Sequence, residues 1–158
     1  VSTVVLGCAH THRFEQSPQV DPLEDNLFPD RSIAFDGTPT PEEYTAEAGG
    51  HNYTITGMRG HAEQILTRWF SRSEIVEDPG EADLVFRYDL DLDLTAGFVG
   101  TQCMASVQWD ILENDRRVST GSATRSAQAA AMPAGGTDCE LAAIDAMIDA
   151  LVDGIENM

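Results

Sequence analysis

The clearest pattern in the chain is an alternation of apolar and polar side chains over residues 84–94. One parity holds only apolar side chains: Leu84, Phe86, Tyr88, Leu90, Leu92 and Leu94. The other parity includes three aspartates, Asp89, Asp91 and Asp93. Because successive side chains of a strand point to opposite faces, this predicts a strand with one buried face and one acidic, solvated face. The three aspartates are candidate contacts for a protein partner.

The segment that follows predicts a hairpin in the same sheet. Apolar side chains alternate from residue 103 to residue 111, and Asn114-Asp115 suits a two-residue turn. That turn places Glu113 opposite Arg116 and Ile111 opposite Val118, so charge and apolar matching both support the register. The second arm is small and polar, which predicts an edge strand or a face covered by another element.

Helical patterns lie on both sides of these strands. From about His61, a set of apolar residues recurs at helical spacing: Ala62, Ile65, Leu66, Trp69 and Phe70. Later, Thr137 and Glu140 form a capping box that predicts the start of a C-terminal helix. Its predicted core stripe is Leu141, Ile144, Ile148, Leu151 and Ile155, with Asp145, Asp149 and Asp153 on the outside.

This order of elements predicts an α+β fold, in which an antiparallel sheet of three to five strands has two main helices packed on one face. We expect the α+β domain to cover residues 61–158. Residues 9–60 are rich in proline and glycine and predict loops and extended chain with one or two short strands. Residues 1–8 are apolar, and are either the remnant of a signal peptide ending in a lipobox or a short strand.

The charge of the chain limits its partners. The 158 residues carry a formal net charge of −18, with acids spread along the whole length and no lysine. Nucleic acid and anionic lipid headgroups are polyanions, so neither is expected to bind without help. The acids predict a solvated surface, which a salt-rich habitat or solubility alone would explain.

The three cysteines predict one disulfide, which an oxidising envelope compartment would favour, and one odd cysteine. Cys103 begins a predicted strand and Cys139 begins the last helix, and these elements must pack together, which favours a disulfide between them over two buried free thiols. Cys8 is then the odd cysteine. Val5-Leu6-Gly7-Cys8 is close to a bacterial lipobox, so we expect a lipid anchor on Cys8, the alternative being a chance Gly-Cys at the end of a strand.

Metal binding is the competing chemistry. Cys8, His10 and His12 alternate, so an extended segment presents all three on one side, where they could bind Zn²⁺ or Cu²⁺ with His51 or His61 as a further ligand. Asp89, Asp91 and Asp93 have the spacing that begins a Ca²⁺ loop, but Leu94 and Gly100 stand where an EF-hand needs glycine and glutamate. The default expectation is no cofactor, with Zn or Ca as the alternative.

From His61 onward the layout resembles that of small bacterial envelope lipoproteins, namely the DUF4136-type proteins and, more loosely, the auxiliary lipoproteins of lipid-transport systems. The matching stretches are a helix at 62–70, a strand beginning Glu81-Ala82-Asp83-Leu84-Val85, a strand at 105–111 and a helix at 141–155. A lipidated cysteine matching Cys8 completes the resemblance, which implies no catalytic residues.

These observations predict a non-catalytic accessory or interaction domain of the cell envelope, at the outer membrane, in the periplasm or on the extracellular surface. Its partner is an envelope protein or a second copy, bound at the acidic face or by strand addition along residues 118–128. The membrane is reached only through the lipid on Cys8. Alternatives are a small metal-binding protein or metal-dependent hydrolase using Cys8, His10 and His12, and a structural subunit of a surface assembly.

Overall fold

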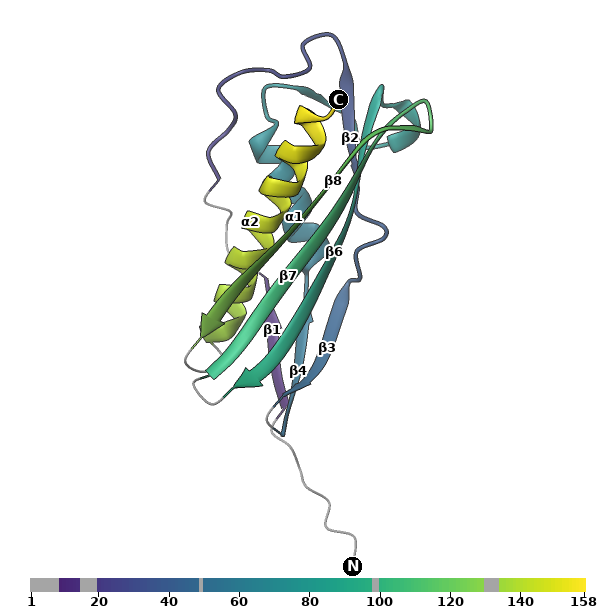
Figure 1. Ribbon diagram of the computed structural model, residues 1–158. Coiled ribbons are helices and arrows are strands. Elements are labelled where there is room, and N and C mark those ends of the chain that lie inside the picture. The colour runs from purple at the N-terminus through teal and green to yellow at the C-terminus, as the bar shows by residue number, and fades with distance from the viewer. Residues whose placement is uncertain (1–8, 15–19, 49, 98–99, 130–133) are drawn as a thin grey trace, which may run out of the picture.

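The computed structural model describes residues 9–14, 20–48, 50–97, 100–129 and 134–158 (Figure 1). Two helices and two sheets make up this part of the chain, which confirms the predicted α+β fold. In chain order the elements are β1 (Ala9–Arg13), β2 (Ser32–Asp36), β3 (Glu43–Ala48), β4 (His51–Thr56), α1 (Met58–Trp69), β5 (Glu74–Ile75), a 3₁₀ turn (Pro79–Glu81), β6 (Leu84–Gly97), β7 (Gly100–Glu113), β8 (Arg116–Ala129) and α2 (Ala134–Glu156).

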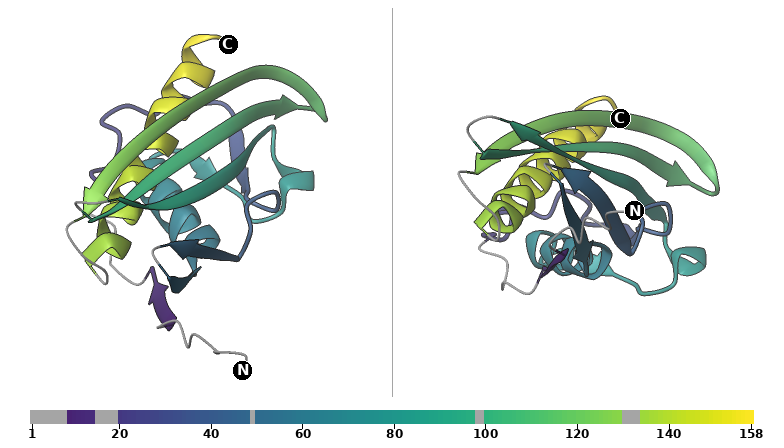
Figure 2. Two further views of the ribbon diagram at one scale, coloured as in Figure 1. Left: turned by 60° about the horizontal axis from the view of Figure 1, so that its bottom comes forward. Right: turned by 90° about the horizontal axis from the view of Figure 1, so that it is seen from below.

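The larger sheet has the strand order β5-β2-β6-β7-β8. Strands β6, β7 and β8 form the expected antiparallel meander, whereas β2 runs parallel to both β5 and β6, so the sheet is mixed rather than purely antiparallel. Both helices lie on the same face of this sheet (Figure 2). The alternation that predicted β6 is confirmed: Leu84, Phe86 and Leu90 are fully buried, and the aspartates of the other parity are exposed.

Residues 9–60 hold more regular structure than the expected one or two short strands. They supply β1 to β4, and three of these form a second sheet in which β4 pairs with β1 in parallel and with β3 in antiparallel orientation. Each strand has only five or six residues and few apolar side chains, such as Tyr53 and Ile55 in β4. Such short alternations between prolines and glycines carry a weak strand signal, which is why the pattern underestimated this sheet.

Side chains, rather than another strand, complete the edge of β6 where β2 ends. Thr40 is fully buried, and its hydroxyl donates to the Tyr88 carbonyl (3.2 Å) and accepts from the Leu90 amide (3.0 Å). The Tyr44 hydroxyl donates to the Leu90 carbonyl, and burial raises its pKa, so it remains a donor. Arg59 of α1 fixes this loop by donating from Nε to the Thr40 carbonyl at 2.9 Å.

The β7–β8 turn is as predicted, but the register beyond it is shifted. Asn114 and Asp115 have φ of 51° and 60°, which suits a type I′ hairpin, and Glu113 pairs with Arg116. The predicted pairing of Ile111 with Val118 is wrong: an irregularity between Ile111 and Leu112 places Ile111 opposite Ser119. An extra residue in one strand reverses which side chains face the core beyond it. The small residues Ser119, Gly121 and Ala123 therefore face the helix, and Thr120, Ser122 and Thr124 face solvent.

Helix α2 buries mainly small side chains, and of the predicted core stripe only Leu151 is fully buried. It begins at Ala134, upstream of the predicted cap at Thr137. Its buried face includes Ala142, Ala143, Ala146, Ala150 and Leu151, whereas Leu141 is 55% exposed and Ile144, Ile148 and Ile155 are only half-buried. The cause is the close approach of β8, because a Cβ on Gly121 would lie 2.1 Å from the Ala150 carbonyl oxygen. Only small side chains fit between these two elements.

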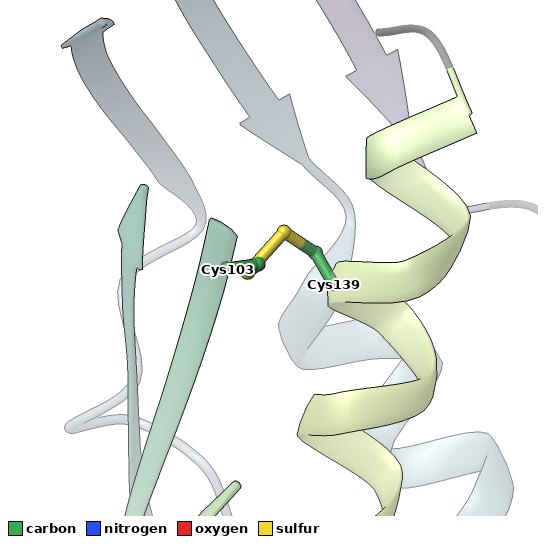
Figure 3. Close-up of a disulfide and its surroundings, with 2 residues drawn as sticks. All are labelled: Cys103 and Cys139. Atoms are coloured by element: carbon green, nitrogen blue, oxygen red, sulfur yellow. A yellow bond between two sulfur atoms is a disulfide. The ribbon is translucent and has the colours of Figure 1, made fainter. Parts of the chain in front are cut away.

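A disulfide joins Cys103 of β7 to Cys139 in the second turn of α2 (Figure 3), as the sequence predicted. The two Cα atoms are 5.3 Å apart, and both residues are almost completely buried. The bond ties the early part of α2 to the sheet across a separation of 36 residues. Within the described residues, neither helix is long and apolar enough to cross a membrane.

Candidate functional site

Strand β8 lies at one end of the larger sheet, and its outer edge pairs with no other strand in the described part of the chain. The direction in which the backbone N–H and C=O groups of β8 point can be derived from β6, which lies on the far side of β7. The Tyr88 carbonyl and the Leu90 amide bond to Thr40, so these groups point away from β7. Tyr88 is opposite Trp109, so this is a pair without mutual hydrogen bonds, and the backbone groups of Trp109 point to β8.

The same alternation fixes the backbone of β8. Trp109 pairs with Gly121, so Gly121 and the residues of its parity bond to β7. The Thr120 hydroxyl donates to the Trp109 carbonyl at 2.8 Å, which agrees with that carbonyl facing β8. From Thr120 onward, the even-numbered residues of β8 therefore direct their backbone N–H and C=O groups to the open edge. Those among them whose side chains are described and exposed are Thr120, Ser122, Thr124 and Ser126.

One arginine limits access to this edge. Arg125 donates from Nη1 to the Thr124 carbonyl at 2.9 Å, and it forms an ion pair with Asp149 of α2. Natural sheets often protect an edge strand with a charged side chain, a proline or a bulge. Here the bulge lies at the turn end of the hairpin, and no proline occurs in β8. Among the described residues, the edge from Thr120 to Ser126 is therefore long and polar, and the flexible side chain of Arg125 is the group that limits access to it.

The three aspartates of β6 lie on the outer face of the same sheet, exposed as predicted. Across the sheet, Asp89 is opposite Gln108, Asp91 is opposite Ser106 and Asp93 is opposite Met104, which is 41% exposed. Hydroxyl side chains follow on β8, where the Thr124 hydroxyl oxygen lies 3.2 Å from that of Ser106 on β7. The outer face thus grades from acidic on β6 to neutral and hydroxyl-rich on β8.

A buried His–Glu pair links the two helices, and the sequence analysis missed it. His61 Nε2 of α1 lies 2.6 Å from Glu140 Oε1 of α2, and both side chains are 5% exposed. Phe14, Met58, Ile65 and Met147 surround the pair. Burial lowers the pKa of His61 and raises the pKa of Glu140, so it favours the neutral form of each side chain. The signal that was available is the position of His61 on the apolar side of α1, beside Ala62 and Ile65.

Above this pair, a polar groove opens at the start of α1. Its larger part has a volume of about 570 Å³ and is lined by Arg13 and Arg59 together with Glu42, Glu43 and Glu63. The Arg59 guanidinium is held by contacts within the protein: it pairs with Glu42 at 2.9 Å and donates to the Thr38 carbonyl at 3.2 Å and to the Thr40 carbonyl. The groove therefore has mixed charge, and Arg59 on its wall holds the loop between β2 and β3 in place.

The predicted metal ligands are only partly brought together. His10 Nε2 lies 3.0 Å from His51 Nδ1, and the His10 ring stacks on Tyr53 with a centroid distance of 5.2 Å. His12 lies instead against Phe14, at a centroid distance of 5.4 Å. Among the described residues, no group of three or more His, Cys, Asp or Glu could hold a metal ion. Cys8, the predicted lipidation site and third ligand, lies outside the described residues.

Solved structures with a similar fold come from bacteria. Protein XCC0632 of Xanthomonas campestris, of family DUF330, is 12% identical, with a TM-score of 0.62 over 93% of this chain and 95% of that protein. Lipoprotein GNA1162 of Neisseria meningitidis is 12% identical, with a TM-score of 0.44 over 80% of this chain and 99% of that protein. No protein-family model matches the sequence, and no curated protein does. The likeness to the DUF330 protein shows a shared fold.

Proposed function

We propose that this chain is a non-catalytic accessory domain of the cell envelope, which binds an extended segment of a protein partner along the outer edge of β8. The observation that carries this proposal is the row of outward-directed backbone groups from Thr120 to Ser126. An extended segment that adds to such an edge gains main-chain hydrogen bonds along its length. The small exposed side chains of Ser122 and Thr124 leave room for it.

The disulfide supports the location outside the cytoplasm. Disulfides persist in oxidising compartments and are rare where glutathione and thioredoxin keep thiols reduced. Both cysteines are in the core, where the bond ties α2 to β7, so the bond is part of the packing of the domain. Lipidation of Cys8 remains part of the proposal as the route to a membrane surface.

Burial of the His–Glu pair favours a non-catalytic role. His61 and Glu140 are the residue types of general acid–base catalysis, but apolar side chains enclose them and their side chains are 5% exposed. A catalytic group must come within hydrogen-bond reach of its substrate. The pair is therefore better explained as a polar link between α1 and α2.

Strand addition is tested by comparing Thr124→Pro with Thr124→Ala. Proline at this position removes an amide that points outward and keeps every backbone bond to β7, and both substitutions remove the contact of the Thr124 hydroxyl with Ser106 of β7. The full chain is expressed in its own cells, chemically cross-linked in the intact envelope and purified with whatever is attached.

We expect a defined envelope protein with the wild type and with Thr124→Ala, and its loss with Thr124→Pro. Ala123→Pro is a control for the assigned direction, because it removes a bond to β7 and should destabilise the fold. Equal recovery of the protein with Thr124→Pro and Thr124→Ala would show that the edge is not the binding site.

A further inference from the structure

Helix α2 carries a line of large apolar side chains that the sheet does not cover. Leu141 is 55% exposed and Val152 is 39% exposed, and Ile148 lies half-buried between them. Their spacing of seven and four residues places them in one line along the helix, which Ile144 and Ile155 border. We call Leu141, Ile148 and Val152 the outer stripe.

The outer stripe is a consequence of how α2 packs. The helix meets β8 through alanines, with Ala150 close to Gly121, so its isoleucines and leucines cannot take that side. A soluble helix usually buries the large residues and exposes the small ones. Here large apolar side chains remain at the surface along about 17 Å of helix.

Acidic side chains flank the outer stripe on the side toward β8. Asp145 and Asp153 are exposed, Asp149 lies one turn from each and pairs with Arg125, and α2 contains no basic residue. Charges that flank an apolar helical seam decide which partner helix is accepted. A second copy of α2 would bring acid against acid, and anionic lipid would be repelled in the same way.

We infer that the outer stripe is a docking surface for a cationic amphipathic helix of a protein partner. Apolar side chains of that helix at spacings of three and four residues would cover Leu141, Ile148 and Val152, and its lysines or arginines would face Asp145 and Asp153. This surface is distinct from the edge of β8, so the inference goes beyond the proposed strand addition and does not depend on it.

The test uses the full chain and a fluorescent peptide of about 21 residues, with leucines at heptad spacing and lysines beside them. A matched peptide replaces each lysine with glutamate. Binding is followed by fluorescence anisotropy at about 0.15 M salt, where non-specific attraction to the acidic chain is screened. Leu141→Gln and Val152→Gln should each weaken binding of the cationic peptide by about tenfold, since a few apolar contacts carry most of the binding energy of a docked helix.

Controls come from the opposite face of the sheet. Met104→Gln removes a comparably exposed apolar side chain, and Asp91→Asn removes an equal charge, so each should change the affinity by less than about twofold. Asp145→Asn should weaken binding by about threefold. Thr124→Pro should leave peptide binding unchanged, which separates this inference from the strand-addition proposal.

Several outcomes would overturn the inference. One is equal weakening by Met104→Gln and Leu141→Gln, and another is equal binding of the acidic peptide. The others are a different occupant of the outer stripe: a dimer in sedimentation that Leu141→Gln dissociates, or capture by phosphatidylcholine vesicles that Leu141→Gln abolishes. Circular dichroism of each variant verifies that the exposed substitutions leave the fold intact.

Discussion

Strand β8 and helix α2 approach closely at Gly121, and Gly121→Ala should destabilise the domain by about 3 kcal/mol. A Cβ there would lie 2.1 Å from the Ala150 carbonyl oxygen and 2.7 Å from the Gly154 nitrogen, whereas ordinary contact begins at 3.4 Å. Both atoms belong to the helix backbone, so no side-chain rotation relieves the clash. The helix must move away by roughly 1 Å, which loosens the alanines packed beneath it.

Two other glycine-to-alanine substitutions are controls that should not destabilise the fold. Gly60 lies on the exposed side of α1 with nothing within 4 Å of a new Cβ, so Gly60→Ala should stabilise the fold by about 0.5–1 kcal/mol through helix propensity. At Gly154 a Cβ would meet Ile111 Cδ1 at 3.5 Å, which is ordinary contact, so Gly154→Ala should be neutral or slightly stabilising.

The assay is equilibrium unfolding in urea, followed by circular dichroism. With a slope of about 2 kcal/mol per molar urea, Gly121→Ala should lower the midpoint by about 1.5 M, and Gly60→Ala should raise it by a few tenths of that amount. The close approach of β8 and α2 would be refuted by a change below about 0.5 kcal/mol for Gly121→Ala, or by equal effects at Gly121 and Gly154.

Three further predictions concern the interior and the loop held by α1. Removing the disulfide by Cys103→Ala with Cys139→Ala should cost about 3–4 kcal/mol of unfolding free energy in urea, and no change would show that the bond is absent in solution. Burial lowers the pKa of His61 below its usual 6.5 and raises the pKa of Glu140 above its usual 4.5. The contribution of Glu140 to stability is therefore present below pH 4.5 and is lost as the pH rises, whereas that of His61 is present above pH 6.5 and is lost as the pH falls. Both contributions are reduced between pH 4.5 and pH 6.5, so the stability from this pair should be lower in that window than the same two residues would give with unshifted pKa values. The urea midpoint across about pH 4–8 should show this dependence only in the wild type, and an identical profile in a variant with leucine at both positions would contradict it. Finally, Arg59→Ala should destabilise the fold by about 2 kcal/mol in the same assay, whereas Arg116→Ala, at an exposed position, should stay within about 0.5 kcal/mol.

The sequence predicted structure well where a long strand or helix buries one face that is apolar along its whole length. The alternation of β6 and β7 extends over many residues, so the buried parity could be assigned directly, and the two cysteines could be placed on packed elements. The hairpin turn could be identified as well, because Asn114-Asp115 suits the positive φ that this turn requires.

The face of α2 could not be predicted from hydrophobicity alone. Large apolar residues are normally assigned to the core, which selected Leu141, Ile144 and Ile148. The buried face was decided by a tertiary feature, the bulge that turns Gly121 toward the helix, where β8 lies close to Ala150. A one-residue shift in β8 therefore changed the interpretation of a helix far along the chain.

Glu140 shows the same limit at the level of chemistry. A glutamate three residues after a threonine fits a capping box, but the helix begins earlier and the carboxyl group is buried against His61. The pair joins residues 61 and 140, and no local pattern links positions so far apart. Short strands such as β1 and β4 could not be predicted for a related reason: pairing with neighbouring strands stabilises them more than the strand propensity of their own residues does.

The most direct test of the central claim is residue-resolved hydrogen exchange of β8, free and with the cross-linked partner bound. In the free chain, the outward amides of Ser122 and Thr124 should exchange quickly, while those of Gly121 and Ala123, bonded to β7, exchange slowly. With the partner bound, the outward amides should become protected. Outward amides that are already protected in the free chain, or that remain unprotected in the complex, would contradict binding by strand addition.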